Sequence, residues 1–462
     1  MNLQNKNAIY NILGPVILNG VNFFTIPIFT RLLGPEQYGV VAVYKTWVGI
    51  FTILMGLQVQ GSIGAATVYL EEKEIPKYLS STLALGLLFS FVCFIVGSFA
   101  AESLAGLLFL TGESLGLMAL QSVGMFVVTF SSVAFIFLKK AQFSFLVNVS
   151  AAVLGIGCSL YLTMYCFPAD RLFLGSMYGT ALPVAFIALL AVLYFLHHGS
   201  WTLRWSHIRF CLPICLPLIF HGLSHMVLGQ SDRVLLQRMV GNADAGIYSF
   251  MIIFSNVLVT IWGALNNTWV PFYYDDVKAG RIDAIHEKSR HYIFLYVIIL
   301  MVFILWAPEV IELFAPKAFW PAISLLPLFV LSNYFTFLYS FPVNFQFYHK
   351  TTYTIATGTL LAALLNIGLD LLLIPRWGMA GSAFATLAAH AALFLFHEYI
   401  AARVLSAPYH YSLRFFLPGL LAVCSVLAFF VLCRNIILVR WGVGIILSLV
   451  FFRDVYRRRR IF

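Results

Sequence analysis

Long apolar runs separated by short polar segments make up most of the chain. A helix needs about 20 apolar residues to cross the hydrocarbon core of a bilayer. Runs of this kind predict transmembrane helices near residues 8–31, 39–65, 80–100, 115–138, 143–165, 172–196, 210–230, 244–270, 292–314, 320–347, 352–374, 379–402, 414–433 and 436–452. The runs are continuous rather than alternating, which excludes a closed β-barrel. The pattern therefore predicts an all-α integral membrane protein with about 14 transmembrane helices.

The composition agrees with this pattern. Hydrophobic residues make up 61% of the chain and charged residues 10%, and the mean hydropathy is +0.92. Soluble domains are about 45–50% apolar and about 25% charged, so most of this surface must face lipid or other helices. The seven cysteines lie in or beside apolar runs. We expect free thiols and no metal site, because no histidine or carboxylate spacing completes a ligand set.

Basic residues give the chain a formal net charge of +10 and also predict its orientation. If the N-terminus is cytoplasmic, most of the 28 Lys and Arg residues fall in loops and helix ends on the inner side, as the positive-inside rule requires. We therefore predict that both termini are cytoplasmic, together with a polar connection at 271–291 that includes a short interfacial helix. The charge reflects topology, and no nucleic-acid partner is expected.

The chain contains an internal repeat with an offset of 207 residues. In the turns after the first and seventh spans, one arginine and two glycines match: Arg31, Gly34 and Gly39 with Arg238, Gly241 and Gly246. This offset equals six spans and predicts two six-helix lobes related by an axis along the membrane normal. The alternative is chance similarity between glycine-containing turns. We expect pseudo-symmetric lobes at 1–200 and 201–412, and two additional helices with a basic cytoplasmic tail at 413–462.

Polar and small residues form stripes along several predicted spans. A charge inside a membrane span is costly and commonly faces a cavity or a partner, and Lys45 lies well inside the second span. The stripes occur in both halves and favour a shared hydrated central cavity, lined by Asn22, Arg31, Lys45, Gln60, Asn256 and Asn333. The alternative is that these side chains mediate close helix packing, while Arg31 and Lys45 extend to the membrane interface.

Two groups of residues are candidates for proton or ion coupling. His221, His225 and Asp232 lie on one face of the seventh span if it stays helical that far. A histidine pair above a carboxylate can relay or sense protons near neutral pH. The alternative is packing together with an ion pair between Asp232 and a neighbouring arginine. Asp370, near one end of the eleventh span, is the other candidate.

Catalytic alternatives find little support in the sequence. The acidic residues in 275–287 lack the repeated spacing that would hold magnesium around a pyrophosphate. The chain also has no phosphate loop, nucleophile elbow or zinc signature. A glycan polymerase or ligase would be expected to carry a large external loop, and none is predicted. We therefore expect a transporter and not an enzyme, with no catalytic residue, metal or cofactor.

Three segments carry a family resemblance: FFTIPIFTRLLGPEQYGVVAVY at 23–44, LGQSDRVLLQRMVGNADAGIYSFM at 228–251 and LNIGLDLLLIPRWGMAGSAFATLAAH at 365–390. They resemble the opening, the helix 7–8 junction and the helix 11–12 junction of bacterial polysaccharide-unit or O-antigen-unit flippases. These flippases belong to the multidrug/oligosaccharidyl-lipid/polysaccharide exporter superfamily. Asp370 takes a place where relatives often carry asparagine, so any role of this residue is specific to the present sequence.

The resemblance implies a V-shaped bundle of two lobes around a central cavity. It implies a flippase that moves an undecaprenyl-pyrophosphate-linked oligosaccharide across the bacterial cytoplasmic (inner) membrane by alternating access, for surface polysaccharide biosynthesis. Arg31 and Lys45 would then meet phosphate oxygens through charge-assisted hydrogen bonds. The implied partners are this glycan, membrane lipids and other polysaccharide-assembly membrane proteins. The alternatives are a multidrug cation antiporter, which would need carboxylates absent from the first two spans, and a membrane-embedded glycan polymerase or ligase.

Overall fold

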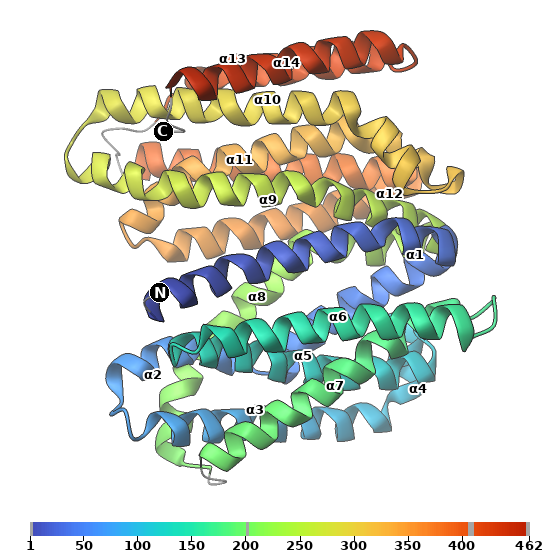
Figure 1. Cartoon of the computed structure of the whole chain (residues 1–462), viewed down its shortest axis with the longest axis vertical. Coiled ribbons are helices and arrows are strands. Elements are labelled where there is room, and N and C mark those ends of the chain that lie inside the picture. Colours follow the sequence, from blue (N-terminus) through green and yellow to red (C-terminus); the bar gives the residue numbers. More distant parts are fainter. Residues whose placement is uncertain (1–2, 200–202, 405–410, 459–462) are drawn as a thin grey trace. The chain divides into compact units, whose positions relative to one another are not determined.

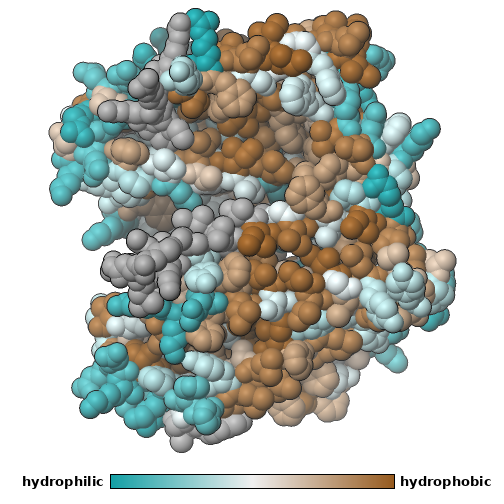
Figure 2. All heavy atoms as spheres, in the orientation of Figure 1, coloured by the Kyte–Doolittle hydropathy of each residue, from teal (hydrophilic) through white to brown (hydrophobic). Residues whose placement is uncertain are grey.

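The computed structural model describes residues 3–199, 203–404 and 411–458, and for most residues before Phe23 it describes the backbone alone. Over these residues the chain forms 14 α-helices and no strand, which confirms the all-α fold class (Figure 1). Eleven helical segments are long and apolar enough to cross a membrane. Figure 2 shows hydrophobic side chains over broad areas of the visible surface of the protein, as contact with lipid requires.

The chain divides into two compact units, residues 1–246 and 247–462. The first unit contains α1 (Leu3–Met55), the 3-10 helix η1 (Val59–Ser62), α2 (Ile63–Tyr69), α3 (Ile75–Phe99), α4 (Ala101–Leu108), α5 (Gly112–Phe137), α6 (Ala141–Tyr165), α7 (Leu172–His198), α8 (Trp205–Met239) and the start of α9 (Asn242–Lys278). The second unit contains the rest of α9, α10 (Ile282–Phe314), the 3-10 helix η2 (Lys317–Leu325), α11 (Leu326–Tyr348), α12 (Thr352–Tyr399), a π-helical turn (Ile400–Val404), α13 (Leu413–Leu432) and α14 (Ile437–Arg458).

Two of the long helices are bent at a glycine. α1 is kinked at Gly34, where φ is 63°, and α12 at Gly378, where φ is 54°. Glycine adopts these angles without steric cost because it has no Cβ. Each kink joins two segments that the sequence assigns to successive membrane spans. The backbone at Gly34 and Gly378 is not helical, so the expected turns between successive spans lie at these two glycines.

The prediction of one continuous span at 39–65 is wrong. α1 ends at Met55, and Leu57 and Gln58 follow with left-handed backbone angles (φ 49° and 52°). η1 and α2 then complete the segment. Non-glycine residues with positive φ are uncommon and mark a locally strained backbone. The apolar side chains around this break resemble those of a helix, so hydropathy alone does not reveal it.

The polar connection expected at 271–291 is also corrected. α9 continues to Lys278 and α10 begins at Ile282, so both helices extend into this segment and no separate interfacial helix forms. Asp276 is 1% exposed and accepts hydrogen bonds from Arg281 (2.9 Å from Nε) and Lys288 (2.6 Å). The charges that suggested a long polar loop instead pair with one another at the junction of the two helices.

Element bounds agree with the sequence repeat. α3 begins at Ile75 and α10 at Ile282, which is 207 residues later. The second segment of α1, which follows Gly34, has the same offset from the start of α9 at Asn242. The segment of α12 after Gly378 likewise corresponds to α7, which starts at Leu172. The lobe boundaries at 200 and 412 stay predictions.

Aromatic side chains form the core of the first unit. Phe130 of α5 packs edge-to-face on Phe126 of the same helix and on Phe195 of α7, with ring centroids 6.2 and 5.6 Å apart. Tyr78 and Leu79 of α3 belong to the same buried cluster. Edge-to-face pairs of this kind add to the burial of apolar area. This core joins α3, α5 and α7 into a body against which α1 and α8 pack.

Candidate binding site on helices α1 and α8

α8 packs against the second segment of α1 through polar contacts in the first unit. The helices approach closely at Gly49, where an added Cβ would lie 2.4 Å from the terminal methyl of Met226. The Thr46 hydroxyl donates a hydrogen bond to Oε1 of Gln230 (3.1 Å). Arg233 donates to the same oxygen from Nη1 (3.2 Å). Gln230 therefore links a side chain of α1 to a cation of α8.

Lys45 lies next to this interface. Its side chain is exposed and makes no hydrogen bond to any residue that the structure describes. Its charge interacts repulsively with that of Arg233 on α8. Apart from Glu36 near its start, the second segment of α1 contains no acidic residue. Lys45 therefore has no carboxylate near it on its own helix segment, and a lysine beside an arginine can attract an anion, since both cation types bind phosphate oxygens.

Three other predicted site residues lie elsewhere on the same chain segment. Arg31 is exposed at the end of the first segment of α1 and donates to its own helix at the carbonyl of Pro27 (2.9 Å). The kink at Gly34 separates it from Lys45 along α1. Gln60 lies in η1, beyond the end of α1, so it does not continue the helical stripe of Lys45. The side chain of Asn22 is outside the described residues.

The remaining two cavity candidates belong to the second unit. Asn256 is exposed on α9, whereas Asn333 is buried on α11 and donates to the Phe329 carbonyl of its own helix (2.8 Å). A hydrogen bond to the preceding turn is what a polar side chain makes when it packs inside a bundle. A cavity shared by residues of both units stays a prediction.

The candidates for proton coupling differ in their exposure. His221 and His225 are exposed on α8, while Asp232, two turns further along, is 3% exposed. Asp370 is fully buried in α12 of the second unit. Buried carboxylates are costly unless they are paired or protonated, so both aspartates remain of interest. Their coupling to ions or protons stays a prediction.

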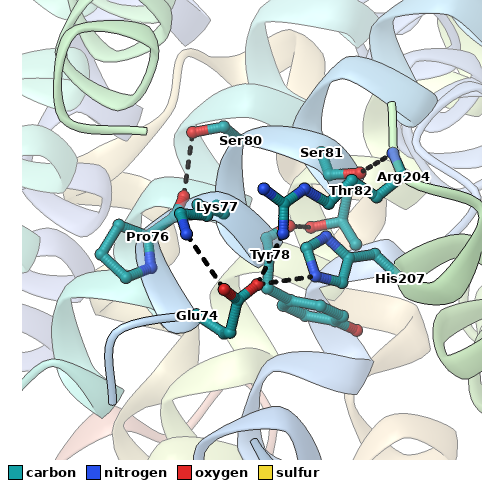
Figure 3. Close-up of polar contacts among 9 residues, drawn as sticks. All are labelled: Glu74, Pro76, Lys77, Tyr78, Ser80, Ser81, Thr82, Arg204 and His207. Carbon is teal, nitrogen blue, oxygen red and sulfur yellow. Dashed lines mark hydrogen bonds and ion pairs between the residues drawn. The ribbon is translucent and has the colours of Figure 1, made fainter. Parts of the chain in front are cut away.

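A polar cluster fixes the start of α8 to α3 (Figure 3). Glu74, the residue just before α3, accepts hydrogen bonds from Lys77 (3.0 Å) and from Nη1 of Arg204 (2.9 Å). Nε2 of His207 lies 3.6 Å from the same carboxylate. The hydrogen bond from Lys77, together with the positive charges of Lys77, Arg204 and His207, holds the pKa of Glu74 below its usual range and outweighs the opposing effect of desolvation.

The same junction continues into the interior. The hydroxyl of Tyr78 donates to Ser62 of η1 (2.6 Å), and the Ser62 oxygen lies 3.4 Å from the sulfur of Cys211 on α8. The backbone N–H of Arg204 donates to Ser81 on α3 (3.1 Å). α3, η1 and the start of α8 are thereby linked. The sequence does not reveal this cluster, because its contacts between α8 and the other elements span more than 100 residues and its members look like ordinary polar residues at helix ends.

Comparison with known proteins identifies relatives along most of the chain. A family model described as "Polysaccharide biosynthesis protein" matches residues 5–273. "Lsg locus putative protein 1" of Haemophilus influenzae is 22% identical over 394 residues, which cover 82% of this chain and 94% of that protein. An "Uncharacterized membrane protein" of the same organism is 23% identical over 392 residues, covering 80% and 89% of the two chains.

Solved structures share the fold. The lipid II flippase MurJ, in an inward closed conformation, has a TM-score of 0.65 at 15% identity and covers 96% of this chain and 99% of its own. An inward-facing multidrug resistance transporter of the MATE family has a TM-score of 0.64 at 17% identity, covering 88% and 94%. These likenesses confirm the all-helical transporter fold. They do not by themselves distinguish the cargo, because one fold hosts several functions.

Proposed function

Because the chain belongs to the polysaccharide biosynthesis protein family, we propose that it is a flippase for lipid-linked oligosaccharides. The proposed cargo is an undecaprenyl-pyrophosphate-linked glycan, moved from the inner to the outer leaflet of the bacterial cytoplasmic membrane. Alternating access would expose the site first to one side and then to the other. In the orientation that the basic residues favour, both termini are cytoplasmic and the Gly34 kink is at the outer side.

The observation that carries this proposal is the cationic face formed by Lys45 and Arg233. Lys45 has no hydrogen-bond partner among the described residues, and the second segment of α1 offers no carboxylate near it. An uncompensated ammonium inside a membrane costs at least about 2.5–3.5 kcal/mol on insertion scales. A pyrophosphate at this face would supply the missing counter-charge, while the lipid chain of the cargo stays in the bilayer.

A multidrug cation antiporter would need the opposite electrostatics. Binding an organic cation at α1 would favour a carboxylate on that helix, and the segment instead presents Lys45. The buried carboxylate of the neighbouring helix, Asp232, is not on the exposed surface that carries Lys45. Reversing the charge at Lys45 should therefore affect a cation exporter and a flippase differently.

Charge substitutions at Lys45 test the proposal in a flippase-null strain, with surface polysaccharide normalised to membrane-inserted protein. Lys45→Ala should lower export, and Lys45→Arg should retain part of it because the charge is kept while its shape changes. Lys45→Glu should be the most severe, since it places a like charge against phosphate. Lys73→Glu reverses an exposed lysine in the connection before α3 and serves as the matched control.

Full complementation by Lys45→Glu would contradict the assignment of Lys45 to anion binding. A gain of resistance to cationic dyes in the Lys45→Glu strain, without any polysaccharide export by the wild type, would instead support the antiporter.

A further inference from the structure

A cavity of about 710 Å³ opens in the first unit, at the end of the bundle that carries the Gly34 kink. It lies between the start of the second α1 segment, the ends of α4 and α8, and the starts of α5, α7 and α9. Its volume falls within the range of about 300–1,000 Å³ that is usual for small-molecule sites. The residues that matter for its chemistry are Glu36, Gln37, Phe109, Phe173, Gln237 and Asn242.

One side of the cavity is held in place by Gln37. Its Nε2 donates to the carbonyl of Ala169 (2.7 Å), and its Oε1 accepts from the backbone N–H of Phe173 (2.9 Å). Both ends of this amide are therefore used to attach the segment before α7 to α1. The position of the Phe173 ring at the cavity is fixed as a consequence. A preorganised site binds its ligand with a smaller loss of conformational entropy.

The opposite side is a chain of polar groups. Gln237 donates to Oδ1 of Asn242 (2.8 Å), and Asn242 donates to Oε1 of Glu36 (2.9 Å). Oε1 of Gln237 is shielded from solvent and accepts no hydrogen bond from the described residues. Buried acceptors are nearly always satisfied, and because Gln237 lines the cavity, rotation of its amide would bring this oxygen to a ligand donor. Together, these amides and the carboxylate form a set of acceptors for hydroxyl or amide donors.

Phe109 stands at the edge of the same cavity with its ring exposed. The side chain is 44% exposed, and its backbone adopts a left-handed conformation with φ of 55°. This conformation ends α4, because the backbone N–H of Phe109 bonds back to the carbonyls of Ala105 and Gly106, and it sets the position of the ring. The guanidinium of Arg238 lies over the ring, 5.5 Å from its centroid. An exposed aromatic ring beside hydrogen-bonding groups offers an apolar surface for a partly polar ligand.

We propose that this cavity binds a short run of sugar residues, the glycan part of the cargo. Sugar hydroxyls donate hydrogen bonds, which the carboxylate of Glu36 and the amide oxygens of Gln237 and Asn242 can accept, and the C–H faces of sugar rings pack on aromatic rings such as Phe109. A pyrophosphate suits the cavity poorly because Glu36 and Asp170 line it. No group of three or more His, Cys, Asp or Glu residues that could hold a metal occurs among the described residues.

The second segment of α1 contributes to both sites, with Gln37 in the cavity and Lys45 on the cationic face. Gln37 and Lys45 are eight residues apart on α1, or about 12 Å at 1.5 Å per residue. A lipid-linked oligosaccharide carries its phosphates next to the lipid and its sugars beyond them, so a spacing of this order suits adjacent parts of one molecule. The identity of the cargo rests on the proposed function, but sugar binding in this cavity is testable without it.

Saturation-transfer NMR on the full chain in lipid nanodiscs tests the proposal directly. The probe is the mixture of oligosaccharides released by mild acid from the surface polysaccharides of the bacterium that carries this gene. Phe109→Ala, an exposed substitution, and Gln237→Leu should each weaken binding about tenfold, and Phe109→Tyr should retain it. Glu113→Gln is the matched control, because Glu113 starts α5 at the same end, bonds to Tyr178 and does not line the cavity.

Absence of saturation transfer to any sugar would overturn the proposal, as would equal affinity in Phe109→Ala and wild type. Displacement of the sugars by inorganic pyrophosphate would also overturn it, since the cavity would then be an anion site. Lys45→Ala separates this proposal from the flippase assignment. Sugar binding by a wild-type protein that fails to restore export in the flippase-null strain leaves the cavity assigned and refutes the flippase, whereas loss of export in Lys45→Ala with sugar binding kept is the result that both proposals expect. Export that depends on Lys45 without sugar binding does the reverse.

Discussion

Gly39→Ala perturbs the closest backbone contact between the second segment of α1 and the start of α9. A Cβ at Gly39 would lie 1.9 Å from the carbonyl oxygen of Asn242, and a Cβ at Gly246 would lie 2.0 Å from that of Pro35. Gly39 and Gly246, like Pro35 and Asn242, are 207 residues apart. Gly39 therefore faces Asn242, and Gly246 faces Pro35 in the matching way. Reciprocal contacts of this kind are typical of a local two-fold axis.

The size of the effect follows from these distances. Real Cβ atoms essentially never approach other atoms within 3.0 Å, so alanine at position 39 requires the two backbones to move apart by at least 1.1 Å at Asn242. The opposing atom belongs to the backbone of a helix and cannot rotate away. Overpacking of this kind costs about 1–3 kcal/mol. If the contact forms in only one of the two access states, this energy lowers the population of that state relative to the other by about 5–150-fold.

Cross-linking measures the population of this contact. Cysteines at Glu36 and Asn242, whose side chains are hydrogen-bonded at 2.9 Å, would be placed in a background without the seven native cysteines and oxidised in membranes. Gly39→Ala and Gly246→Ala should each slow cross-linking, and the double variant should add little, because both disrupt one contact. Gly116→Ala, where an added Cβ meets no atom within 4 Å, is the control. Unchanged cross-linking in Gly39→Ala would refute the reasoning.

Two further predictions concern stability, measured as the melting temperature of the detergent-solubilised protein. Because the pKa of Glu74 is lowered in the folded protein, its contribution to stability is present above the ordinary pKa of 4.5 and is lost as the pH falls through the lowered pKa. Glu74→Gln should therefore flatten the fall in melting temperature on the acid side. A variant whose melting temperature depends on pH as that of the wild type does would count against this role of Glu74. Arg440 is 2% exposed and pairs with Glu309 between α14 and α10. Arg440→Met should destabilise the protein by about 3 kcal/mol, the lower end of the range for breaking a buried ion pair, because Glu309 is partly exposed. The double variant Arg440→Met with Glu309→Leu should recover most of this loss. No recovery in the double variant would contradict the pairing.

Much of the helix layout was predictable because bilayer thickness fixes the length of each apolar run. The span predicted at 172–196 is α7, which extends from Leu172 to His198. The break after Met55 was not predictable, because Leu57 and Gln58 continue a segment whose hydropathy is that of a helix. The extension of α9 and α10 through 271–291 was missed for a related reason. Composition records the charges of this segment but not the pairing of Asp276 with Arg281.

The candidate site was predictable only where one residue stood out against its surroundings. Lys45 is a lone cation inside an apolar run, and the structure leaves it exposed and without a hydrogen bond to the described residues. Its neighbours on α8 were not predictable, since Gln230 meets Thr46 across 184 residues of sequence. The cavity residues, such as Phe109 and Gln237, come from separate helix ends. Polar residues are expected at every helix end, so no local pattern distinguishes these.

The sugar cavity and the glycine contact share Asn242, and this makes their energetics interdependent. Asn242 lies against Gly39 through its carbonyl and bonds to Glu36 through its side chain, so the cavity wall is complete only while the contact is made. The apparent affinity of a ligand falls by the fraction of protein in the binding-competent state. Gly39→Ala should therefore weaken sugar binding by the same factor as it slows cross-linking, although it touches no sugar. Titration of the oligosaccharide mixture against Gly39→Ala and Gly116→Ala measures that factor. Weakened cross-linking with unchanged sugar affinity would show that the cavity is independent of the contact, and that the glycan does not report the access state.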